Sequence, residues 1–154
     1  MNFEEFKTLT ESGVGLGVAS RDKDLIPCLD DLMGLKLDPD GKSLVCFINS
    51  EESAKALENF RSCPQIAISL SRPCDNFAAQ IKGQVTRIRG MTEEELARSQ
   101  AWADLYRQEL ILINVCPETV AGLDMSADAA LEVTIEDLFI QTPGLQAGDR
   151  MASR

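Results

Sequence analysis

A hydroxyl and an ammonium near the start of a predicted helix form the first candidate site. Ser53 and Lys55 lie in the first turn of a helix that we expect to begin after Ser50, its predicted N-cap. The N–H groups of a helix N-terminus lack intrahelical partners and carry partial positive charge. Together with these side chains they could hold a phosphate. Alternatively, both are solvated residues of the helix surface, and spacing alone does not decide.

Two further pairs of polar residues lie on predicted strands. Gln80 and Lys82 alternate along one strand, so they share a face of it. Their amide and ammonium groups could donate hydrogen bonds to the edge of a planar ring or to a phosphate. Ser20 and Arg21 lie at the end of the first predicted strand, where the next strand could border such a ring. Alternatively, Gln80 and Lys82 are solvent-facing residues of an edge strand, and Ser20 and Arg21 belong to an ordinary hairpin.

The chain contains no histidine, which restricts the chemistry it could perform. Histidine is the most common general base and the most common metal ligand. Its absence excludes Ser-His-Asp and Cys-His catalysis and zinc hydrolysis. We therefore expect no metal site and no catalytic side chain, so an enzyme of this sequence would use the chemistry of a cofactor.

Length, charge and cysteine content indicate one cytoplasmic domain. The 154 residues form one domain, 1–154, with a disordered tail from about 149. The net charge of −10 argues against binding nucleic acid or an anionic membrane, both of which need a basic surface. Five widely spaced cysteines, no signal peptide and no membrane-spanning run favour a reduced cytoplasmic protein.

The elements that must position these residues are mostly strands. Strands in consecutive hairpin order favour a mainly β fold, an antiparallel sheet or barrel. Gly83, inside one strand, predicts a bulge or a close approach. We expect six strands, over residues 14–20, 25–33, 43–49, 65–70, 77–88 and 130–141.

Short helices are expected between these strands. Glu51 and Glu52 would occupy the first turn of the helix after Ser50. Thr92 and Glu95 form a capping box for a helix that ends near residue 110. On that helix we place four side chains on the buried face, with Trp102 as a core anchor rather than a ring-stacking residue: Leu96, Trp102, Leu105 and Tyr106. The other predicted helices cover residues 3–10 and 117–122, and the cysteines, Cys46 above all, are predicted core residues.

Several motifs occur in an order that resembles the pyridoxamine 5'-phosphate oxidase-like, FMN-binding split-barrel family. They are VASRDxxLxP, SxKALxNFRxxPQIAIS, QIKGxV and FIQTPGLQAGD, and they span residues 12–148. The resemblance implies a six-stranded antiparallel split barrel that forms a homodimer with two FMN sites at its interface. A dimer also hides the open edges of a small barrel. The implied cofactor-binding positions are Ser20, Arg21, Ser53, Lys55, Gln80 and Lys82.

Two functions follow from this resemblance. The first is an FMN-dependent oxidoreductase of a small molecule, in which the flavin performs the redox chemistry. The second is a non-catalytic module that binds flavin, haem or another ring on the same dimeric barrel. Asp30 and Asp31 favour the second, because they stand where flavin-binding members commonly carry basic or hydroxyl side chains. Successive residues of a strand face opposite ways, so only one of them would face the site.

Overall fold

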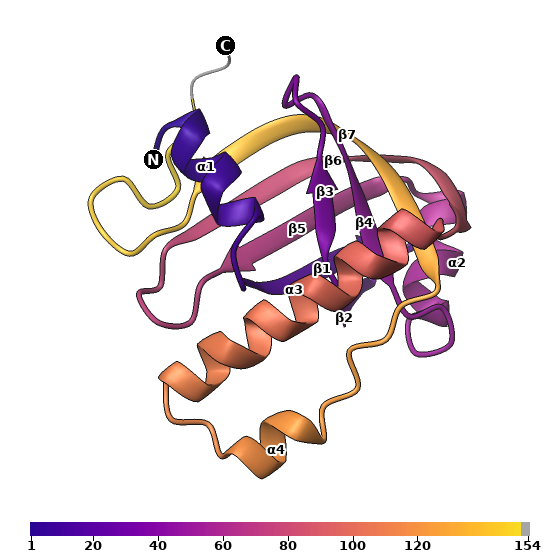
Figure 1. Ribbon diagram of the computed structural model, residues 1–154. Helices are drawn as coiled ribbons and strands as arrows, with labels where there is room; N and C mark the ends of the chain where they lie inside the picture. Colours follow the sequence, from indigo (N-terminus) through magenta and orange to yellow (C-terminus); the bar gives the residue numbers. More distant parts are fainter. Residues whose placement is uncertain (152–154) are drawn as a thin grey trace.

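Seven antiparallel strands form one sheet in the computed structural model of the chain, which describes residues 1–151 (Figure 1). The order across the sheet is β2-β1-β5-β6-β7-β4-β3. This confirms the mainly β, antiparallel prediction. The strands are β1 (Gly15–Arg21), β2 (Pro27–Asp31), β3 (Leu35–Leu37), β4 (Ser43–Ile48), β5 (Gln65–Ser71), β6 (Ala78–Gly90) and β7 (Ala129–Ile140).

The count differs from six because the strand predicted over 25–33 is shorter and the chain turns after it. β2 ends at Asp31, and Gly34 has a φ of +115°, which glycine adopts without steric cost. The intervening residues close the barrel. The Leu32 N–H donates to the Leu16 carbonyl on β1, and the Met33 N–H donates to the Phe47 carbonyl on β4. The segment between β2 and β3 therefore joins two strands that lie far apart in the sheet order.

The bulge predicted at Gly83 is confirmed. The register between β6 and β7 shifts between Lys82 and Gly83. A Cβ atom at Gly83 would lie 2.1 Å from the Thr134 carbonyl oxygen, so the two backbones approach too closely for any side chain.

Within residues 1–151 four helices accompany the barrel: α1 (Phe3–Thr10), α2 (Ala54–Ser62), α3 (Glu93–Leu112) and α4 (Pro117–Ala121). Figure 1 shows α3 crossing the barrel, with α4 projecting beyond it. The prediction that Ser50 caps α2 is wrong. The Ser50 hydroxyl instead donates to Asp128 at 2.6 Å, and α2 begins only at Ala54. Glu51 and Glu52 consequently lie in the turn before α2, outside its first turn. In the described part of the chain no helix combines the length and apolarity needed to cross a membrane.

The buried face of α3 differs from the predicted one. Trp102 is the expected anchor, because it is buried and its indole N–H donates to the Val14 carbonyl at 2.9 Å. Leu96 and Leu105 are exposed, contrary to the prediction. The reason is that the helix also turns polar residues inward, with Glu95 and Ser99 both buried.

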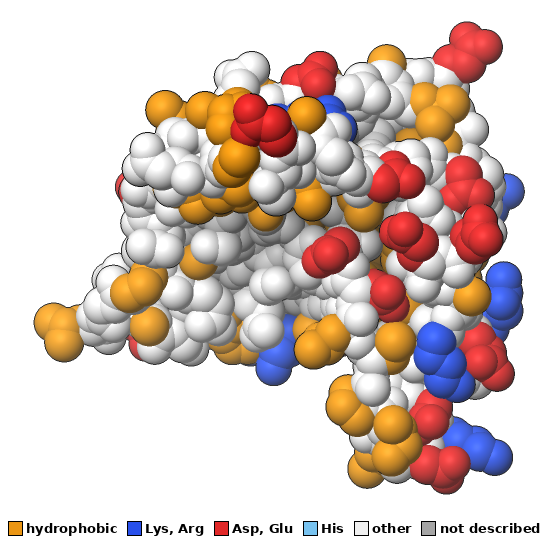
Figure 2. Space-filling model, turned by 90° about the horizontal axis from the view of Figure 1, so that it is seen from below, with side chains coloured by type: hydrophobic (Ala, Val, Ile, Leu, Met, Phe, Trp, Pro, Cys, Tyr) orange, Lys and Arg blue, Asp and Glu red, His pale blue; other side chains and the backbone are white. Residues whose placement is uncertain are grey.

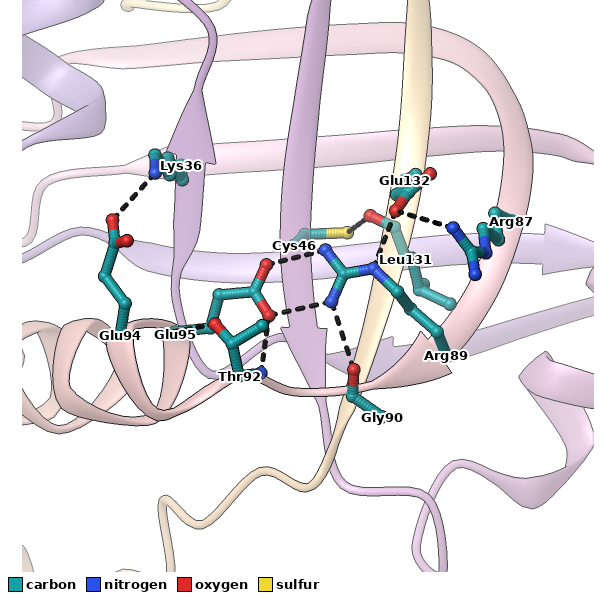
Figure 3. Close-up of polar contacts among 10 residues, drawn as sticks. All are labelled: Lys36, Cys46, Arg87, Arg89, Gly90, Thr92, Glu94, Glu95, Leu131 and Glu132. Carbon is teal, nitrogen blue, oxygen red and sulfur yellow. Dashed lines mark hydrogen bonds and ion pairs between the residues drawn. The ribbon is translucent and has the colours of Figure 1, made fainter.

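An ion-pair network explains why Glu95 is buried (Figure 3). The Arg89 guanidinium on β6 donates to both Glu95 carboxylate oxygens, at 2.8 and 2.7 Å, and to Glu132 on β7 at 2.6 Å. Glu95 also accepts from the Thr92 N–H, which completes the predicted capping box. Arg89 therefore fixes the start of α3 to two strands.

The cysteines and the C-terminus only partly match the predictions. Burial raises the pKa of the Cys46 thiol to about 12, as expected for a core residue, whereas Cys74 and Cys116 are exposed. Residues 149–151 pack along β7, where the Met151 N–H donates to the Leu138 carbonyl and its side chain is buried. The rest of the predicted disordered tail, 152–154, lies outside the described residues.

Candidate functional site

The outer face of β1, β5 and β6 carries a shallow groove built on small residues. Side chains alternate along these strands, so Leu16 and Val18 enter the core while Gly17 and Ala19 face outward. Ala19 lies opposite Ala67 of β5 in the register. The groove on this surface has a volume of about 290 Å³. Its lining is Ala19, Ser20, Arg21, Gln65, Ile66, Ala67, Lys82, Gly83 and Glu136.

Two cations border this groove and form no ion pair with any described carboxylate. The Arg21 guanidinium donates to the Gln65 side-chain oxygen and to the Asp22 carbonyl, both neutral acceptors. The Lys82 ammonium lies 5.0 Å from the centre of the Phe139 ring. Arg21 and Lys82 therefore bring two positive charges without an ion pair to one groove, which forms a local basic site. An anion that enters the groove would meet both.

The groove also contains one carboxylate, Glu136. It accepts a hydrogen bond from the Gln84 side-chain amide at 2.5 Å. Sequence reasoning missed Glu136 and Gln65 as members of the site. Strand alternation could have found Gln65, because it shares the outer face of β5 with Ala67. Glu136 is the unpaired residue of the bulge in β7, where alternation no longer assigns the face.

The structure brings together three of the six predicted positions, namely Ser20, Arg21 and Lys82. Ser20 is buried, and its hydroxyl accepts a hydrogen bond from the buried Asn59 amide at 3.1 Å, which joins α2 to β1. Gln80 shares the face of Lys82, as alternation predicted, but does not line the groove.

Ser53 and Lys55 also lie outside the groove. Ser53 is the N-cap residue of α2, but its side chain makes no capping hydrogen bond and is buried. The Lys55 ammonium is exposed and pairs with Glu58 at 3.1 Å, and this hydrogen bond raises the pKa of Lys55. A phosphate at the helix start would have to compete with that carboxylate.

The inner side of β2 adds further negative charge near Lys55. The Cys28 thiol donates to the Asp30 carboxylate at 3.4 Å. Burial and this carboxylate raise the pKa of the Cys28 thiol, so it remains protonated at neutral pH. Asp31 is exposed, and alternation turns it away from Asp30 as predicted. The helix start therefore offers one cation among several carboxylates, whereas the groove offers two cations and one carboxylate.

No family model matches this chain, and no curated protein matches it in sequence. Solved structures do match it. HupZ from Group A Streptococcus aligns with a TM-score of 0.58 and 16% identity, over 96% of this chain and 100% of that one. A candidate pyridoxamine 5'-phosphate oxidase from Lactobacillus delbrueckii aligns with a TM-score of 0.55 and 13% identity, over 88% and 91%. An F420 reductase aligns with a TM-score of 0.54 and 17% identity, over 86% and 94%.

These alignments extend over nearly the whole of each chain, so they compare complete barrels rather than a shared hairpin. At such low sequence identity they establish the fold and leave the ligand open. The chain has the split-barrel fold of the pyridoxamine 5'-phosphate oxidase-like, FMN-binding proteins.

Proposed function

We propose that this protein is an FMN-binding flavoprotein that acts as an oxidoreductase on a small molecule. The observation that carries the proposal is the pair of unpaired cations, Arg21 and Lys82, at a flat groove on a split barrel. A phosphate needs charged donors, and an isoalloxazine ring needs a flat surface without side chains that project into it. Ala19 and Ala67 provide such a surface in the same groove.

The two cations of the groove fit a flavin phosphate in charge. Arg21 and Lys82 would hold the phosphate, since charge-assisted hydrogen bonds are the stronger ones in proteins. Bound flavin would supply the hydride transfer. A chain without histidine therefore needs no catalytic side chain of its own for this reaction. The groove volume of about 290 Å³ lies near the lower limit of ligand pockets, so it would cover only part of FMN.

We expect Lys82→Met to weaken FMN binding about tenfold to a hundredfold, because it removes one charge-assisted contact to the phosphate. Riboflavin lacks the phosphate, so its affinity should change little. Fluorescence titration of both flavins against the wild type and the variant measures the difference.

Lys55→Met is the matched control, because it removes the same charge at the alternative phosphate position. Its FMN affinity should equal that of the wild type. If Lys55→Met weakened FMN binding and Lys82→Met did not, the phosphate would lie at the start of α2 and the groove assignment would be wrong. Failure of the wild type to bind either FMN or a deazaflavin would reject the flavin proposal.

A non-catalytic binding module on the same barrel is the second candidate function. Glu136 in the groove favours it, because a carboxylate near a flavin opposes the negative charge of the reduced ring. Oxidation of NAD(P)H by the flavin-loaded protein distinguishes the two. Turnover supports the oxidoreductase, and tight flavin binding without turnover supports the module.

We also propose that the protein is a cytoplasmic homodimer. All five cysteines are unpaired, as expected in a reducing compartment. The β1–β2 hairpin exposes three large apolar side chains: Leu25, Ile26 and Leu29, the last 79% exposed. Exposed apolar residues gathered on one hairpin are typical of an interaction surface. A second copy packed there would also cover the open side of the groove.

Light scattering should give twice the chain mass of 16.9 kDa, and Leu29→Glu should shift the protein toward monomer, since it places a charge in an apolar interface. Leu112→Glu, on an exposed leucine at the end of α3, is the control and should remain dimeric. A wild-type mass of one chain would rule out the dimer. A monomeric Leu112→Glu would place the interface on α3.

A further inference from the structure

A second pocket, of about 180 Å³, lies between α3, the end of β2 and the segment that follows α4. It shares no residue with the groove of the proposed flavin site. The nine residues that line it are Leu16, Asp31, Leu32, Met33, Trp102, Tyr106, Leu123, Asp124 and Met125. What this pocket binds is therefore a separate question from flavin binding.

Two stacked aromatic rings form one wall of this pocket. The centres of the Trp102 and Tyr106 rings lie 5.4 Å apart, and the ring planes differ by 17°. The hydrogen bond from the Trp102 indole to the Val14 carbonyl fixes the orientation of the pair. The Tyr106 ring packs against Gly15, where a Cβ atom would lie 3.2 Å from the phenol oxygen. The wall is thus rigid and rich in π electrons. The Met33 side chain, which also lines the pocket, adds a polarisable sulfur.

The charged residues of this pocket are both carboxylates. Asp31 comes from β2 and Asp124 from the segment after α4, so they approach from two separate elements. Neither forms an ion pair with a lysine or arginine of the described chain. Hydrogen bonds from Ser126 lower the pKa of Asp124, which keeps that carboxylate ionised. Burial and the charge of Asp31 raise the pKa of Tyr106, so the phenol stays neutral beside it.

An aromatic wall next to uncompensated carboxylates selects for positive charge. The face of an aromatic ring attracts cations, and tryptophan does so most strongly. The overall charge of the chain acts in the same direction. Figure 2 shows that Asp and Glu side chains gather on one part of the face seen from below, whereas the fewer Lys and Arg side chains lie mainly at its rim. A net charge of −10 further raises the local concentration of cations.

We propose that this pocket binds a small organic cation, an ammonium group carried on a compact apolar body. The ammonium would lie between the two carboxylates and the aromatic wall. The apolar body would contact Leu16, Leu32 and Met33. The volume of about 180 Å³ suits a ligand much smaller than a flavin.

Trp102 is the single tryptophan of the chain and lines this pocket, so its fluorescence reports on binding directly. The probe is benzyltrimethylammonium, titrated into the flavin-free protein at constant ionic strength, because salt screens the attraction. We expect a saturable change in emission. Benzyl alcohol, the neutral comparison, should bind about tenfold more weakly, and benzoate should not bind.

Asp31→Asn tests the charge without changing the shape of the side chain. It should weaken binding of benzyltrimethylammonium about threefold to tenfold, while leaving benzyl alcohol unaffected. Asp24→Asn, in the turn between β1 and β2, removes the same charge outside the pocket and should behave as the wild type. Equal affinity for the cation and the alcohol, or an unchanged cation affinity in Asp31→Asn, would overturn the proposal. These results do not depend on whether FMN binds.

Discussion

Arg89→Met should lower the free energy of unfolding by about 2–3 kcal/mol, at or just below the lower end of the range for breaking a buried ion pair. The loss is large because one side chain joins β6, β7 and the first turn of α3 through Glu95 and Glu132. The Glu95 side chain is only 9% exposed, so its carboxylate would keep only the Thr92 N–H as a partner and would lack a cation in a site of low solvent access. Partial exposure of Arg89, at 22%, keeps the effect below the maximum.

Arg87→Met is the matched control for this variant. Arg87 lies two residues earlier on the same strand and reaches Glu132 only at 4.0 Å, with its side chain 67% exposed. Exposed pairs of this kind contribute between zero and about 1 kcal/mol. Urea denaturation of both variants, followed by far-UV circular dichroism, measures the difference. Equal stability of the two would show that Arg89 does not hold α3 to the sheet.

The Arg89 network also predicts how the stability of the protein changes at low pH. The Arg89 hydrogen bonds lower the pKa of Glu95 from its ordinary value of 4.5 to about 2. A lowered pKa in the folded state adds stability that is complete above the unfolded-state pKa and is lost as the pH falls. The wild type should therefore lose this contribution between pH 4.5 and pH 2. Arg89→Met lacks this contribution at every pH. The difference in the free energy of unfolding between the wild type and the variant should therefore decrease over that interval.

Local patterns in the sequence predicted much of this fold. Thr92 and Glu95 form the predicted capping box, since a box depends only on residues three apart. Gly83 marks the bulge because glycine inside a strand signals a close backbone approach. The alternation of Gln80 and Lys82 also follows from the strand alone. Such features need no knowledge of distant segments.

The features that sequence reasoning missed depend on contacts between distant segments. Glu95 was not predicted to be buried, because its partner Arg89 is also held by Glu132, which lies on the last strand. Ser50 has the residue type of an N-cap, but its hydroxyl donates a hydrogen bond to Asp128 and α2 begins only at Ala54. The candidate site divided in the same way. Local pattern predicted that these residues are polar, whereas the strand order β1-β5-β6 brings Arg21 and Lys82 to one groove and leaves Lys55 outside it.

The packing of α3 against the start of β1 gives the second large effect, since Gly13→Ala should destabilise the protein by about 3 kcal/mol. A Cβ atom there would lie 2.4 Å from the Leu105 carbonyl oxygen and 2.8 Å from the Tyr106 nitrogen. Both are backbone atoms of α3, so no change of rotamer relieves the clash and the helix itself must move. Trp102 would then lose its hydrogen bond to Val14.

That displacement has a signature distinct from simple loss of stability. Movement of α3 exposes the single tryptophan, so Gly13→Ala should shift Trp102 emission to longer wavelength in the folded protein while its far-UV circular dichroism stays that of the wild type. Gly90→Ala is the control, because a Cβ atom at Gly90 meets nothing within 4 Å. It should keep both the emission and the stability of the wild type. An unshifted emission in Gly13→Ala would mean that α3 is not held by this backbone contact. Since Trp102 and Tyr106 also form the aromatic wall, a shifted helix should weaken binding of benzyltrimethylammonium while leaving the groove at Arg21 and Lys82 intact.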